Sequence, residues 1–117
     1  MRIRRAVHAL GLRYRVGIRP VPTLRRTADL VFTRVRVAVF VDGCYWHGCP
    51  AHHRPSRLNA DFWEAKIAKN RERDAETDAR LREANWTVVR IWEHEDPILG
   101  AERVRATVAA ARTRPSR

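Results

Sequence analysis

The sequence of 117 residues predicts an α/β sandwich, in which helices cover the faces of a central mixed sheet. Short β-branched runs alternate with longer segments of helical periodicity, in the expected order α-β-β-β-α-β-α, which is typical of this layered class. The run "VRVAVFV" at 35–41 is apolar on both faces of the expected strand. This pattern is typical of a central strand covered on both sides. The length fits a single domain over residues 1–112, with a frayed basic tail at 113–117.

The first half of the chain is expected to contain one helix and three strands. Residues 2–10, "RIRRAVHAL", predict a short helix that Gly11 ends, and residues 12–16, "LRYRV", predict a strand. Pro20 and Pro22 place a loop at 18–26. The runs "ADLVF" at 28–32 and "VRVAVFV" are separated only by Thr33 and Arg34, so they predict a hairpin.

The second half predicts a long helix, a strand and a final helix. Asn59 is a suitable N-cap for a helix that continues to about Asn85. Residues 86–92, "WTVVRIW", predict a strand, and a last helix is expected at about 101–111. The inward stripe of the long helix should contain Trp63, Ile67, Asn70, Asp74, Thr77 and Leu81.

The middle of that stripe is polar, and two interpretations of it remain open. Burying Asn70 and Asp74 costs free energy unless they find partners. A slightly rotated helix would leave both in solvent, whereas a functional site above the sheet would use them.

The net charge of +11 predicts a polyanionic partner, and nucleic acid is the commonest one. Lys66 and Lys69 are the only lysines, so a GC-rich coding genome is the alternative explanation of the arginine content. The N-terminal residues lack the apolar run of a signal peptide, and no stretch reaches membrane-spanning length. The protein is therefore expected in the cytoplasm, where cysteines stay reduced.

The stretch "DGCYWHGCPAHH" at 42–53 predicts a structural zinc site. Cys44, Cys49 and His52 have the spacing of a zinc half-site, and thiolate and imidazole are the ligands that zinc prefers. His94, just past the strand at 86–92, is the best candidate for the fourth ligand, and His53 is the alternative to His52. Buried free cysteines beside surface histidines are the competing explanation.

The acids Asp29 and Asp42 are expected on or at the end of neighbouring hairpin strands, where they could hold Mg²⁺. His47 lies between the zinc ligands and is suited to general acid or base catalysis. Taken alone, each acid has an ordinary structural explanation: Asp29 as a residue at the start of a strand and Asp42 as a turn residue. Together with the basic chain, these three residues favour phosphate chemistry.

Four aromatic residues form a candidate DNA wedge. Tyr45 and Trp46 lie in the motif loop, and Phe62 and Trp63 open the long helix. Bulky apolar side chains of this kind are pushed between base pairs by some DNA-binding proteins. The alternative is that some of them pack under the zinc loop.

The segments "ADLVF", "VFVDGCYWHGC", "FWEAKIAKNRERD" and "WTVVRIWEHE" together make the chain resemble the very short patch repair (Vsr) endonucleases. The resemblance covers about Leu12 to His94. It implies a fold like that of type II restriction endonucleases, stapled by structural zinc. It also implies Mg²⁺-dependent nicking of duplex DNA beside a T:G mismatch, by an enzyme expected to act as a monomer and to have mismatch-repair proteins as possible partners.

The resemblance also implies roles for individual residues. Asp29 matches the metal-binding aspartate, and Val41 takes the place whose backbone carbonyl helps to bind the metal. His47 matches the catalytic histidine, and Asp74 matches a helical acid that supports the active site. The residues Tyr45, Trp46 and Trp63 match the aromatic wedge, and the zinc ligands match by region at Cys44, Cys49, His52 and His94.

Two departures from the family define the alternatives. Asp42 stands where the best-known members carry a second catalytic histidine, and an acid there could bind metal instead. The helix that precedes the first strand in the family contributes an acid, whereas residues 2–10 contain none. The acid is therefore expected upstream of Met1, or the active site is incomplete. The competing functions are a catalytically incomplete, zinc-stapled DNA-binding protein and a nuclease of the same fold without mismatch preference.

Overall fold

The computed structural model describes residues 2–43 and 60–113 and confirms the predicted order of elements. This order is α1 (Arg2–Ala9), β1 (Arg15–Ile18), β2 (Ala28–Phe32), β3 (Val37–Asp42), α3 (Ala60–Glu83), β4 (Thr87–Trp92) and α4 (Pro97–Arg112). The predicted N-cap Asn59 lies outside the described residues. No helix in the described part of the chain is long and apolar enough to cross a membrane.

The strands form a mixed sheet, as predicted, and their order in it is β1-β2-β3-β4. Strands β1, β2 and β3 are antiparallel neighbours, whereas β4 runs parallel to β3, with Val37 beside Thr87 and Asp42 beside Trp92. The carboxyl ends of β3 and β4 therefore meet at one edge of the sheet. Residues 43–86 connect them.

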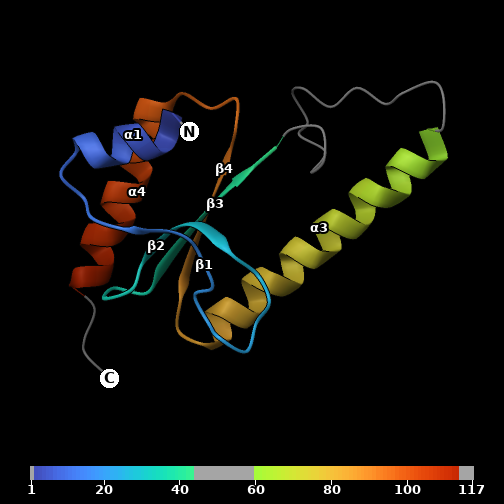
Figure 1. Ribbon diagram of the computed structural model, residues 1–117, viewed down its shortest axis with the longest axis horizontal. Helices are drawn as coiled ribbons and strands as arrows, with labels where there is room; N and C mark the ends of the chain where they lie inside the picture. Colours follow the sequence, from blue (N-terminus) through green and yellow to red (C-terminus); the bar gives the residue numbers. More distant parts are fainter. Residues whose placement is uncertain (1, 44–59, 114–117) are drawn as a thin grey trace.

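Helices cover both faces of the sheet (Figure 1). On one face α1 and α4 pack together over a core that includes Val7, Leu30, Val39 and Val104. On the other face, Leu81 of α3 packs with Val31, Ala38 and Phe40, while the N-terminal end of α3 extends beyond the sheet. Residues 37–40 of β3 are all buried, which confirms the prediction of a strand covered on both sides.

Helix α3 ends at Glu83, slightly before the predicted limit at Asn85, because the chain turns there. Asn85 adopts a left-handed conformation, with φ 68°, which asparagine tolerates better than most residues. The backbone N–H of Trp86 donates to the carbonyl of Leu81 at 2.9 Å, and that of Asn85 donates to Arg82 at 3.0 Å. These two bonds form a Schellman motif, which closes the helix and directs the chain into β4.

The largest errors in the predicted boundaries are at the starts of β1 and α4. Strand β1 begins at Arg15, because the preceding Tyr14 is tied to α1, where its hydroxyl donates to the carbonyl of Arg4 at 2.7 Å. Helix α4 begins at Pro97, ahead of the predicted Ala101. Asp96 caps it by accepting from the N–H of Ile98 at 2.9 Å, and proline is favoured at the first helical position.

Candidate active site

The described residues include five of the predicted site residues, namely Asp29, Val41, Asp42, Asp74 and His94. The predicted residues of the motif loop lie outside them, namely Cys44, Tyr45, Trp46, His47, Cys49, His52 and the alternative ligand His53. Trp63 belongs to α3, but its side chain is not among those that the structure describes.

Asp29 lies where β2 and β3 separate. The backbone pairing of these strands runs from Phe32 beside Val37 to Leu30 beside Val39 and does not continue beyond. The N-terminal end of β2 follows β1 instead, with Ala28 beside Ile18. The gap is bridged by a side chain, because Oδ2 of Asp29 accepts a hydrogen bond from the N–H of Val41 at 2.7 Å.

The peptide of Val41 presents a second oxygen to the same gap. The N–H and C=O of a strand residue point to the same side, and those of the next residue point to the other. Asp42 follows this alternation, since its carbonyl accepts from Glu93 on the β4 side at 2.9 Å. The carbonyl of Val41 therefore faces β2 and Asp29. Carboxylate and carbonyl oxygens are the donors that a hard cation such as Mg²⁺ prefers, so this pair fits such an ion.

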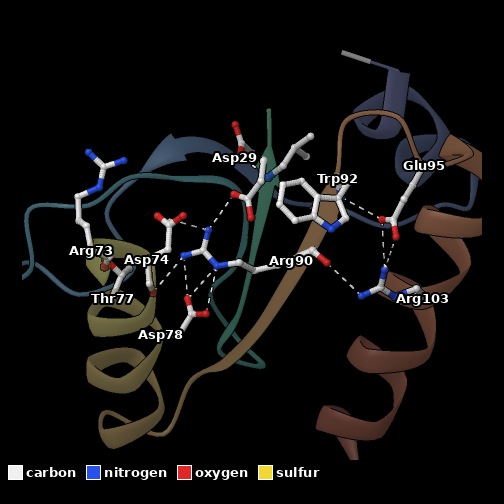
Figure 2. A network of polar contacts seen from close by, with 11 residues as sticks. Asp29, Arg73, Asp74, Thr77, Asp78, Arg90, Trp92, Glu95 and Arg103 are labelled. Carbon is white, nitrogen blue, oxygen red and sulfur yellow. Dashed lines mark hydrogen bonds and ion pairs between the residues drawn. The ribbon is translucent and has the colours of Figure 1, made fainter. Parts of the chain in front are cut away.

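Beside this gap, the guanidinium of Arg90 contacts three aspartates from two other elements. Figure 2 labels two of them, Asp74 and Asp78. Its Nη1 lies 2.8 Å from Oδ1 of Asp42 at the end of β3. Its Nη2 and Nε donate to Asp78 of α3, at 2.8 and 3.0 Å. Asp74 lies one helical turn earlier, with its Oδ1 3.8 Å from Nη1. We call these four residues the Arg90 cluster.

The Arg90 cluster is largely shielded from water. Asp42 is only 8% exposed, and Cζ of Arg90 lies 4.4 Å from the ring centre of Phe40. Burial alone would lower the pKa of Arg90, but the hydrogen bond with Asp78 and the charges of Asp42, Asp78 and Asp74 outweigh it. The pKa of Arg90 is therefore raised above its ordinary value, and the residue is permanently charged.

The cluster shows that the polar middle of the α3 stripe is not simply turned into solvent. Ile67, Thr77 and Leu81 are buried, as predicted, and Asp74 turns toward the sheet and not into solvent. Sequence reasoning missed Arg90 and Asp78. The available signals were a charge in the middle of the apolar strand "TVVRIW" and an acid one helical turn after Asp74.

Other contacts fix the edge where β3 and β4 end. The N–H of Trp92 donates to Oε2 of Glu95 at 3.0 Å, and Arg103 of α4 donates to the carbonyl of Arg90 at 3.0 Å (Figure 2). Gly43 lies beside Glu93, since a Cβ on Gly43 would be 3.8 Å from that carboxylate. His94 is exposed next to this junction. Among the described residues, no group of three or more His, Cys, Asp and Glu side chains is arranged to hold a metal.

Comparison with known proteins identifies relatives. The family described as DNA mismatch endonuclease Vsr matches residues 1–53. The type II nicking enzyme V.NaeI of Lentzea aerocolonigenes is 43% identical over 80% of this chain and 58% of its own length. The type II nicking enzyme V.NmeDIP of Neisseria meningitidis serogroup C is 38% identical over 89% of this chain and 72% of its own.

A third relative, the DNA mismatch endonuclease Vsr of Escherichia coli K12, is 36% identical over 71% of this chain and 52% of its own length. The chain thus spans about half to three quarters of the length of these curated relatives.

Proposed function

The chain belongs to the Vsr family of DNA mismatch endonucleases, and from this premise we propose that it nicks one strand of duplex DNA beside a T:G mismatch. The observation that carries the proposal is the gap between β2 and β3, where the Asp29 carboxylate faces the peptide of Val41. The names of the relatives support strand nicking and, for one of them, mismatch recognition.

We assign Mg²⁺ to the Asp29 carboxylate and the Val41 carbonyl. When bound, such an ion lowers the pKa of a coordinated water and stabilises charge on a phosphate. Asp42 is not assigned as a ligand, because its Oδ1 is engaged by Arg90. It acts instead by fixing the end of β3, next to Val41. His47 is suited to moving the proton during phosphate hydrolysis.

The zinc assignment rests on the chemistry of its donors. Cys44, Cys49, His52 and His94 form a closed set of two thiolates and two imidazoles. His94 directly follows Glu93, whose carboxylate lies beside Gly43, where the chain leaves β3 toward Cys44. A zinc ion held by these residues would tie the motif loop to the end of β4. Tyr45, Trp46 and Trp63 would then supply the wedge at the mismatch.

A catalytically incomplete DNA-binding protein is the second candidate. The observation that favours it is the composition of α1, "RIRRAVHA", which contains no acid to join Asp29. The strong positive charge would suffice for DNA binding without cleavage.

A cleavage assay separates these candidates. We expect the purified chain to nick an end-labelled duplex with a single T:G mismatch in the presence of Mg²⁺, and to stop when EDTA is added. The matched duplex of the same sequence should be cut far more slowly. Equal cutting of both duplexes would favour a nuclease without mismatch preference. Binding without cutting, with Mg²⁺ or Mn²⁺, would favour the DNA-binding protein.

Metal analysis tests the zinc site independently of activity. We expect about one zinc per chain, since a structural site uses four protein ligands. Cys44→Ala should lower the melting temperature, because structural zinc contributes directly to folding. His8→Ala, which changes an exposed histidine of α1, serves as the control and should retain the metal. Purified protein without zinc, or with Cys44 and Cys49 disulfide-bonded, would contradict the assignment.

A further inference from the structure

A cavity of about 680 Å³ opens beside the turn between β2 and β3, and four arginines line it. They come from separate parts of the chain. Arg13 precedes β1, Arg15 begins β1, Arg34 lies in the turn between β2 and β3, and Arg112 ends α4. Tyr14 and Phe32 contribute apolar surface to the same cavity.

The structure shows no acidic partner for these four arginines among the described residues, and they are grouped around one cavity. No carboxylate from the described ranges lines the cavity, and Nη1 of Arg13 donates to the neutral carbonyl of Leu12 at 3.4 Å. By contrast, Arg80 lies 3.1 Å from Glu76, and Arg105 lies 2.8 Å from Glu102. Grouped cations without counter-charges repel one another, so their free energy falls when a polyanion binds.

The position of the cavity separates it from the proposed cleavage site. Val35, in its lining, precedes β3, whereas Val41 faces Asp29 near the other end of that strand. The four steps of extended chain from Val37 to Val41 alone span roughly 13 Å. Acids gather at the Asp29 end and arginines at the cavity end, so a phosphate bound in the cavity is not the one that is cut.

We propose that this cavity is a second phosphate-binding surface, which holds the backbone of duplex DNA away from the cleaved bond. The proposal rests on the proposed function, in that the chain binds DNA. The surface contributes to affinity and its dependence on salt, and it has no part in the chemical step. Arginine suits this role because its planar group donates two parallel hydrogen bonds to a phosphate.

The experiment compares two double variants that remove the same charge. Arg34→Gln/Arg112→Gln removes two cavity arginines, and Arg80→Gln/Arg105→Gln removes two arginines already paired with acids. DNA affinity is measured for an end-labelled duplex over a series of salt concentrations, with EDTA present. The single-turnover nicking rate is then measured with Mg²⁺ at saturating protein. Melting temperatures establish that both variants are folded.

We expect the cavity variant to lower the slope of log Kd against log salt by about two units, close to one for each phosphate that is no longer neutralised. The control variant should change this slope little. At saturating protein, both double variants should nick the DNA at the rate of the unmodified chain. Equal slopes for the two variants would overturn the proposal, as would loss of nicking at saturation in the cavity variant alone. Failure of the unmodified chain to bind DNA would instead overturn the proposed function.

Discussion

Arg90→Met is expected to lower the free energy of unfolding by about 2–4 kcal/mol. Removing one partner of a fully buried ion pair costs about 3–5 kcal/mol, and the Arg90 side chain is 21% exposed, so water screens part of the loss. Methionine keeps much of the length and apolar stem, but Asp42, Asp74 and Asp78 would face one another without a cation. Urea unfolding of the purified variant measures the change.

Arg103→Met is the matched control. Arg103 is also bonded to a carboxylate, that of Glu95, but its side chain is 52% exposed. Its replacement should therefore lower the free energy of unfolding by less than about 1 kcal/mol. Arg90→Lys should be intermediate, because an ammonium cannot reproduce the paired contacts of the guanidinium with Asp78. An Arg90→Met variant as stable as the control would show that the Arg90 cluster contributes little to folding.

Asp29→Asn is expected to reduce nicking by about 10²–10³-fold, the typical effect of removing one preorganised electrostatic interaction. The amide oxygen of asparagine can still accept from the N–H of Val41, so the gap between β2 and β3 should keep its shape. What disappears is the negative charge that would hold Mg²⁺. Single-turnover cleavage of the mismatched duplex and thermal unfolding are the two measurements.

Asp96→Asn provides the same chemical change away from the site. Asp96 caps α4, and asparagine is an equally good N-cap, so activity and stability should both be retained. If Asp29→Asn nicked as fast as Asp96→Asn, the carboxylate of Asp29 would not be the metal ligand. If Asp29→Asn unfolded at a much lower temperature than the unmodified chain, its loss of activity would be due to loss of structure.

The strands were predictable from the sequence because their signals are local. The β-branched run at 28–32 coincides with β2, and the run at 35–41 predicts the start of β3 to within two residues. Boundaries failed where distant contacts decide, as for Tyr14, whose hydrogen bond to Arg4 keeps the first residues of the predicted run 12–16 out of β1. The sequence did not predict that β4 pairs with β3 in parallel. The periodicity of a strand carries no information about which other strand lies next to that strand.

The candidate site was predictable in part. Asp29 and Asp74 were singled out by their positions in the predicted elements and Val41 by the family resemblance, and the structure places all three around the ends of β2 and β3. Arg90 was missed because its role depends on ion pairs with residues of β3 and α3, which are distant from Arg90 in the sequence. An isolated charge in a strand usually indicates a solvent-facing position, and only the packing of α3 shows that this one is enclosed.

The parallel pairing of β3 and β4 has a consequence for the order of folding. Val37 reaches Phe32 through one short turn, but it reaches Thr87 only after the long connection closes, at a greater cost in chain entropy. The antiparallel strands should therefore form first and β4 dock late. Arg90 lies on β4, so its ion pairs with Asp42 and Asp78 can form only once this last strand has docked. The Arg90 cluster is thus completed at the end of folding.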